Sequence, residues 1–171
     1  MHKNRVKKLT ILAMLIALDF VLSPLFRIEG MAPMSSVLNV VAAVLMGPLY
    51  ATMMAVVTAF LRMTLLGIPP LALTGAAFGA LLAGLGYRYW QRVGGAIIGE
   101  IIGTGLIGSL LSYPVMVWFT GSQSGLFWLV YTPRFFGGAI SGTLIAGLVL
   151  YKLQTTSAFR KAQANFRSLM S

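Results

Sequence analysis

The sequence contains no cysteine, a single histidine and only three acidic residues among its 171 positions. The absence of cysteine excludes disulfides, thiolate metal sites and cysteine nucleophiles. The histidine, His2, lies in the basic N-terminal segment, so neither a histidine metal centre nor a Ser-His relay can be built. The acids are Asp19, Glu29 and Glu100, too few for the paired acids and bases that most catalysis requires. We therefore expect no enzyme, no metal and no cofactor.

Charged residues of either sign are scarce, at 9%, whereas a soluble domain carries about 25%. Hydrophobic residues make up 58% of the chain, which excludes an ordinary soluble protein and a disordered one. Thirteen Lys and Arg residues give a net charge of +10. These cations lie at the chain ends and between apolar runs, not on one wet face, which argues against nucleic-acid binding. The composition predicts an integral membrane protein of one domain, embedded in the lipid bilayer.

Six apolar runs, separated by charged, polar or Gly-Pro turns, fill most of the chain. They cover residues 9–26, 35–46, 49–66, 71–87, 94–120 and 126–151. A helix needs about 20 mainly apolar residues to cross the hydrocarbon core. The second run is short for a full crossing, so five crossing helices with a re-entrant segment are an alternative.

The distribution of cations favours six crossings, because cytoplasmic flanks collect Lys and Arg. Ten of the thirteen cations lie in residues 2–8, at Arg88 and Arg92, and after Tyr151. Six crossings place all ten on one side, whereas five would put one basic terminus outside. We therefore expect an all-α membrane protein, a compact bundle of six transmembrane helices over residues 1–151 with both termini cytoplasmic.

The first apolar run follows a basic stretch, as in a signal peptide. Asp19 interrupts the run and no small-x-small cleavage site follows cleanly, so we expect an uncleaved helix. In this helix Ala13 and Ala17 form a small-residue step, which suits either internal packing or the docking of a partner helix. The glycines of the later runs also recur at four-residue steps, and for most of them we expect packing within the bundle. They are Gly75 and Gly79, then Gly95, Gly99 and Gly103, then Gly138 and Gly142.

Apolar residues recur at helical spacing in the basic cytoplasmic tail, residues 152–171. They are Phe159, Ala162, Phe166 and Leu169, with cations between them. This pattern suits a short interfacial helix on an anionic inner leaflet. A frayed terminus is an equal alternative.

Ionisable residues at membrane depth are costly and are candidates for function. Those within the expected spans are Asp19, Arg62, Glu100 and Arg134. The alternative is an internal ion pair, such as Asp19 or Glu100 with an arginine, that only fixes helix register. Arg134 near aromatic side chains at the outer mouth suits a small-molecule pocket, although an interfacial aromatic belt competes for Trp118, Trp128 and Tyr131. The long outward loop carries Arg27, Glu29 and Ser35 and is either a lid over such a site or a connector.

Three stretches, together with six short helices and the Ala13–Ala17 step, resemble the ThiW-type substrate-binding S-components of energy-coupling factor (ECF) vitamin transporters. The stretches are residues 27–36 (RIEGMAPMSS), Gly47-Pro48 with Arg62, and residues 99–105 (GEIIGTG) running on to Tyr113-Pro114. The resemblance implies uptake of hydroxyethylthiazole, the thiazole precursor of thiamine, across the bacterial cytoplasmic membrane. It further implies a transmembrane T-protein, contacted by Ala13 and Ala17, and two ATPase subunits, since this chain has no nucleotide-binding motif of its own.

The chain departs from the S-components that bind whole thiamine, because it has no histidine for a pocket. This departure favours a smaller, neutral ligand such as hydroxyethylthiazole, whose ring could stack on an aromatic side chain. The residues expected to bind it are Asn39, Arg62, Glu100, Thr104, Tyr113, Trp118, Trp128, Tyr131 and Arg134. Another small vitamin ligand and a self-sufficient secondary carrier or channel are the alternatives. A membrane enzyme acting on lipid is the least favoured, given the scarcity of acids, His and Cys.

Overall fold

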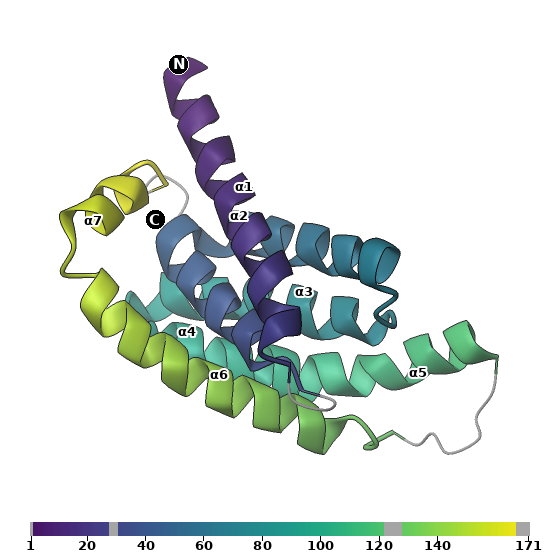
Figure 1. Cartoon of the computed structure of the whole chain (residues 1–171). Helices are drawn as coiled ribbons and strands as arrows, with labels where there is room; N and C mark the ends of the chain where they lie inside the picture. The colour runs from purple at the N-terminus through teal and green to yellow at the C-terminus, as the bar shows by residue number, and fades with distance from the viewer. Residues whose placement is uncertain (1, 28–30, 122–127, 167–171) are drawn as a thin grey trace.

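The computed structural model describes residues 2–27, 31–121 and 128–166, with the first three of these as backbone only. This part of the chain is all-helical (Figure 1). Its helices are α1 (His2–Leu25), α2 (Pro33–Leu66), α3 (Leu71–Trp90), α4 (Val93–Glu100), the π-helix η1 (Ile101–Gly108), α5 (Ser109–Thr120), α6 (Thr132–Leu153) and α7 (Ser157–Ala164). Within the described residues, five helical stretches are long and apolar enough to cross a membrane. Helices α4, η1 and α5 follow one another without interruption and count as one stretch. The prediction of an all-helical membrane protein is confirmed.

Helix α2 is broken at the predicted Gly47-Pro48 turn. Gly47 has φ 80° and ψ 178°, a backbone conformation that glycine adopts far more readily than other residues. Pro48 follows and has no N–H to continue the helix. The break divides α2 into a first arm, residues 33–46, and a second arm, residues 48–66, and the ribbon changes direction sharply between them (Figure 1). These arms correspond to the second and third predicted runs.

The first arm of α2 forms the centre of the bundle. Every residue from Ser35 to Gly47 is buried, and α2 packs against α1, α3 and α6. A helix that is apolar all round is expected where neighbours cover every side. The short second run is thus a core segment.

Helix α3 packs against α4 and η1 with the backbones in close approach. A Cβ atom added at Gly99 would lie 2.1 Å from the carbonyl oxygen of Leu82, and one at Gly103 would lie 2.3 Å from that of Phe78. Side chains at these positions would force the helices apart. The predicted packing role of this glycine face within the bundle is confirmed.

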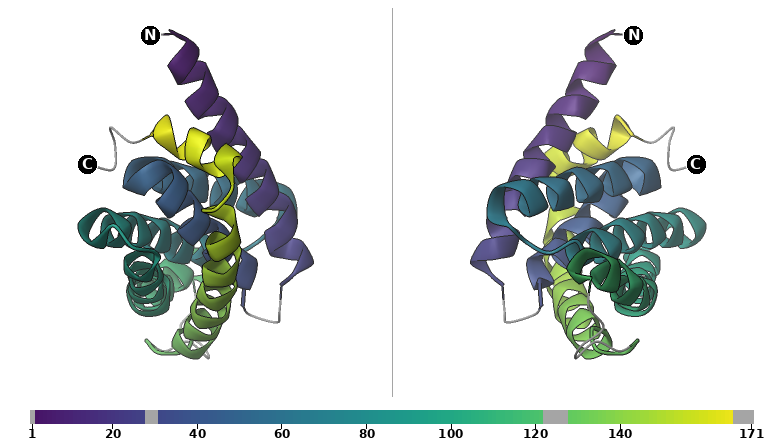
Figure 2. Two further views of the ribbon diagram at one scale, coloured as in Figure 1. Left: turned by 90° about the vertical axis from the view of Figure 1, so that its left-hand side faces the viewer. Right: turned by 90° about the vertical axis from the view of Figure 1, so that its right-hand side faces the viewer.

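The C-terminal segment forms the short helix α7, which is docked on the bundle. Phe159 and Phe166 are buried, and the exposed Arg160 and Lys161 lie on the other side. Figure 2 shows α7 at the same end of the molecule as the start of α1. Residues 157–166 are therefore not a frayed terminus, and their phenylalanines face protein.

Candidate functional site

A cavity lies between α1, both arms of α2, α3, α4, η1 and α6. Its empty volume, which includes space open to solvent, is about 690 Å³. The wall is mainly apolar, with a few polar groups from different helices. The polar and charged lining residues are Ser23, Arg27, Ser35, Ser36, Asn39, Arg62, Glu100, Thr104 and Arg134.

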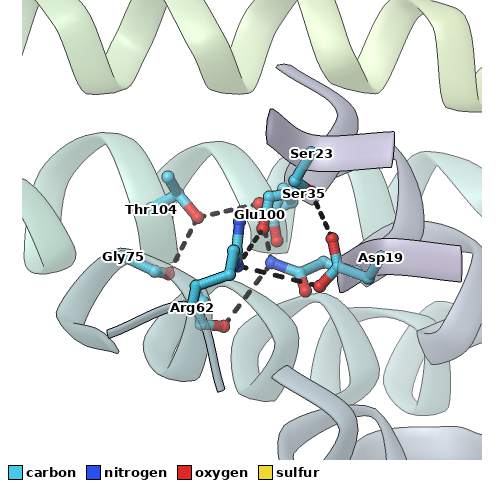
Figure 3. A network of polar contacts seen from close by, with 9 residues as sticks. Asp19, Ser23, Ser35, Arg62, Gly75, Glu100 and Thr104 are labelled. Atoms are coloured by element: carbon cyan, nitrogen blue, oxygen red, sulfur yellow. Dashed lines mark hydrogen bonds and ion pairs between the residues drawn. The ribbon is translucent and has the colours of Figure 1, made fainter. Parts of the chain in front are cut away.

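One side of the cavity is built on a buried ion pair. A guanidinium nitrogen of Arg62 lies 3.8 Å from a carboxylate oxygen of Asp19, and both side chains are almost fully buried. The same nitrogen donates a hydrogen bond of 3.2 Å to the hydroxyl of Ser35. Ser23, one turn after Asp19, donates to the other carboxylate oxygen (Figure 3). This pair is the internal ion pair that the sequence analysis gave as an alternative to a functional role. Together with the hydrogen bond to Ser35 it joins α1 to both arms of α2.

Glu100 forms the centre of a second polar group. Its Oε1 accepts hydrogen bonds from the Thr104 hydroxyl at 2.8 Å and from the Asn39 amide at 3.2 Å. The Thr104 hydroxyl also lies 3.1 Å from the carbonyl of Gly75 (Figure 3). Glu100 ends α4, directly before the π-helix η1, and departures from α-helical geometry of this kind are frequent at functional sites. Glu100 and Thr104, both expected to bind ligand, line the cavity.

Three buried polar atoms on residues that line the cavity have no hydrogen-bond partner in the described part of the chain. They are the acceptors Glu100 Oε2 and Asn39 Oδ1 and the donor Arg62 Nε. An unsatisfied buried polar group costs about 1–3 kcal/mol, so native proteins seldom leave several together. A ligand that brings both a donor and an acceptor would satisfy them.

The structure brings five of the predicted ligand-binding residues to the cavity wall. They are Asn39, Arg62, Glu100, Thr104 and Arg134. Two predicted lid residues, Arg27 and Ser35, also line the cavity, although Ser35 belongs to the first turn of α2 and not to a loop. Glu29, the third, lies outside the described residues.

The predicted aromatic residues lie away from the lining. The ring of Tyr113 packs on that of Trp128, with centroids 4.7 Å apart. Trp118 is 85% exposed, and the buried Tyr131 packs with Met116 and Phe135. Burial raises the pKa of Tyr131, an effect that the positive charge of Arg134 opposes. Only Phe135 of this region reaches the cavity, so ligand contact by the four predicted aromatics stays a prediction.

Sequence reasoning missed Ser23 and Ser36 in the lining. Ser23 follows Asp19 by four residues and Ser36 precedes Asn39 by three, so helical spacing could have placed each beside a polar residue already chosen. Among residues 2–27, 31–121 and 128–166, no group of three His, Asp or Glu side chains could hold a metal ion. The site suits a small organic ligand.

Comparison with known proteins identifies the family of the chain. Residues 9–156 match the family model of ThiW, described as thiamine-precursor transporter protein. A search of curated proteins and a search of solved structures each returned no match. The match to the family model spans both arms of α2, all of α3 to α6 and most of α1. The chain therefore belongs to the ThiW family of thiamine-precursor transporter proteins, which are transporters and not enzymes.

Proposed function

We propose that this chain is the substrate-binding S-component of an ECF-type importer and that its ligand is hydroxyethylthiazole. The observation that carries the proposal is the set of unpartnered buried atoms at the cavity, Glu100 Oε2, Asn39 Oδ1 and Arg62 Nε. A ligand hydroxyl donates one hydrogen bond and accepts others. It would donate to Glu100 Oε2 and accept from Arg62 Nε–H, leaving the thiazole ring against the apolar wall.

The apolar part of the wall supports a small aromatic ring. Phe135, Leu71 and Ile68 line the cavity beside small residues such as Gly75 and Ala76. The aliphatic and aromatic groups would cover the ring, while the polar groups would fix its orientation. In this arrangement Arg27 and Arg134, both exposed, lie at the rim of the cavity.

The topology of the proposed S-component has six crossings, with each arm of α2 counted as one and both termini in the cytoplasm of a bacterial cell. The contact between the first and the last basic regions supports this arrangement. The side-chain nitrogen of Lys8, on α1, lies 5.6 Å from the ring centroid of Phe166, just beyond α7, so these two regions lie at the same end of the bundle. The T-protein would dock on Ala13 and Ala17, which are exposed on α1. Two ATPase subunits would supply the energy.

Calorimetric binding of hydroxyethylthiazole to the purified protein tests the proposal. Wild type should bind without ATP, and Glu100→Ala should weaken binding about 10- to 100-fold, as expected for a lost hydrogen bond to a charged group. Arg134→Ala should also weaken binding, whereas Arg160→Ala, an arginine on α7, serves as the matched control. Wild-type affinity in both Glu100→Ala and Arg134→Ala would contradict the placement of the ligand. Binding of another small vitamin, but not of hydroxyethylthiazole, would contradict its identity.

A further inference from the structure

The break in α2 leaves a backbone carbonyl that the helix itself cannot satisfy. In an unbroken helix the carbonyl of Val44 would accept from the N–H of residue 48. Residue 48 is proline, which has no N–H, and Gly47 turns the chain away before it. Val44 is fully buried, so without another donor its carbonyl would be left unsatisfied in the core.

The missing donor comes from α7, more than a hundred residues along the chain. The side-chain amide nitrogen of Gln163 donates to the carbonyl of Val44 at 2.9 Å. Its second N–H donates to the hydroxyl of Tyr87, on α3, at 3.1 Å. One glutamine thus joins the break in α2 to α3 and α7.

Two further contacts hold this region together. Phe166 is fully buried, and its ring meets that of Tyr50, at the start of the second arm, edge to face at 5.2 Å. On α3, a Cβ atom at Gly84 would lie 2.2 Å from Cα of Pro48. The break therefore lies between α3 on one side and α7 on another, and both elements contact the residues where the arms meet.

The angle between the arms determines the geometry of the cavity. The first arm carries Ser35, Ser36 and Asn39 to its wall, and the second arm carries Arg62. Asn39 lies about 12 Å along the helix from Gly47, so a change of about 10° at the break displaces it by about 2 Å. Arg62 lies about 20 Å from the break and would move by about 3 to 4 Å. Hydrogen-bonding sites tolerate errors of only about 0.5 Å.

We propose that Gln163 is a positioning residue for the ligand site, which acts by fixing the angle between the arms of α2 through the carbonyl of Val44. The inference rests on the proposed function only in taking the cavity as the ligand site. Gln163 lies beside the break, and neither Gln163 nor its two hydrogen-bond partners, Val44 and Tyr87, line the cavity. The C-terminal helix thereby sets the shape of a cavity that it does not contact.

The test compares Gln163→Leu, which loses the donor, with Gln163→Lys, which keeps an N–H donor, and with Lys161→Gln on the exposed side of α7. Each is examined for hydroxyethylthiazole affinity and for the distance between spin labels at Phe60, on the second arm, and Leu144, on α6. Both label sites are exposed, and the chain has no native cysteine to interfere. Helix α6 reports on the first arm because a Cβ atom at Gly142 would lie 2.3 Å from the carbonyl oxygen of Pro33.

We expect Gln163→Leu to shift or broaden the distance distribution and to weaken binding up to about tenfold, the effect of one lost buried hydrogen bond. Gln163→Lys and Lys161→Gln should resemble wild type in both measurements. Unchanged distances, or changed distances with wild-type affinity, would overturn the proposal. If Gln163→Leu does not fold, Gln163→Asn, whose amide is one methylene shorter, replaces it with the same expectations. Should wild type fail to bind hydroxyethylthiazole, the proposed function would fail, while the distances would still decide whether Gln163 fixes the arms.

Discussion

The guanidinium of Arg62 lies 3.8 Å from the carboxylate of Asp19, with both side chains buried in the membrane-spanning bundle. Asp19 belongs to α1, whereas Arg62 belongs to the second arm of α2 and lines the cavity. The pair therefore connects the wall of the cavity to the helix that carries Ala13 and Ala17. Since α1 packs mainly on α2, this contact is important for the position of α1.

Removing one member of this pair should destabilise the protein more than removing both. Asp19→Asn leaves the charge of Arg62 buried without compensation, and a broken buried pair costs about 3–5 kcal/mol. Asp19→Asn combined with Arg62→Gln removes both charges and should recover much of that loss. Thermal unfolding in detergent, followed by circular dichroism, measures the difference. A double variant no more stable than Asp19→Asn would show that the two charges do not depend on each other.

The contact between α3 and α4 should tolerate no side chain at Gly99. A Cβ atom there would lie 2.1 Å from the carbonyl oxygen of Leu82, so Gly99→Ala should cost about 1–3 kcal/mol through overpacking. Gly94 provides the matched control, since nothing lies within 4 Å of a Cβ atom at that position. Gly94→Ala should be neutral or slightly stabilising, because alanine favours helix over glycine by about 1 kcal/mol. Equal apparent melting temperatures for the two variants would contradict this packing.

Hydropathy was sufficient to predict that the chain is built of membrane-compatible helices, and Gly47-Pro48 was sufficient to predict the break. The positions of the spans follow from the length of apolar runs, and the break follows from residues with special backbone requirements. The partner of Asp19 could not be chosen between Arg62 and Arg134, because an almost wholly apolar helix has no periodic pattern that shows which side faces inward. The contact of Gln163 with Val44 was likewise hidden, since side-chain hydrogen bonds between distant segments leave no local signal.

The aromatic residues illustrate the same limit. Trp118 and Trp128 were equally compatible with an interfacial belt and with a ligand pocket, because both environments suit a large amphipathic ring. Their exposed fractions, 85% and 57%, and their absence from the cavity lining favour the belt. The aromatic ring that lines the cavity is instead that of Phe135.

Truncating Trp118 should therefore leave ligand recognition intact. Trp118→Ala removes a ring that is 85% exposed and does not line the cavity. Because surface substitutions usually change the free energy by less than about 0.5 kcal/mol, the affinity for hydroxyethylthiazole should remain within about twofold of wild type. Phe135→Ala, which removes a ring from the cavity wall, should weaken binding clearly in the same assay. A tenfold loss of affinity in Trp118→Ala would contradict this prediction and would indicate that the exposed aromatic residues contact the ligand.

Enlarging the small-residue step on α1 should separate partner docking from ligand binding. Ala13 and Ala17 are exposed, and small residues on a membrane helix let a second helix approach closely. Ala13→Leu and Ala17→Leu should abolish co-purification with the T-protein and the ATPase subunits, while hydroxyethylthiazole affinity stays at the wild-type value because neither residue lines the cavity. Ala158→Leu, an exposed alanine of α7, provides the control for an added apolar side chain. Retention of the complex in both α1 variants would place the docking surface elsewhere, and loss of ligand binding together with the complex would point to a general disturbance of α1.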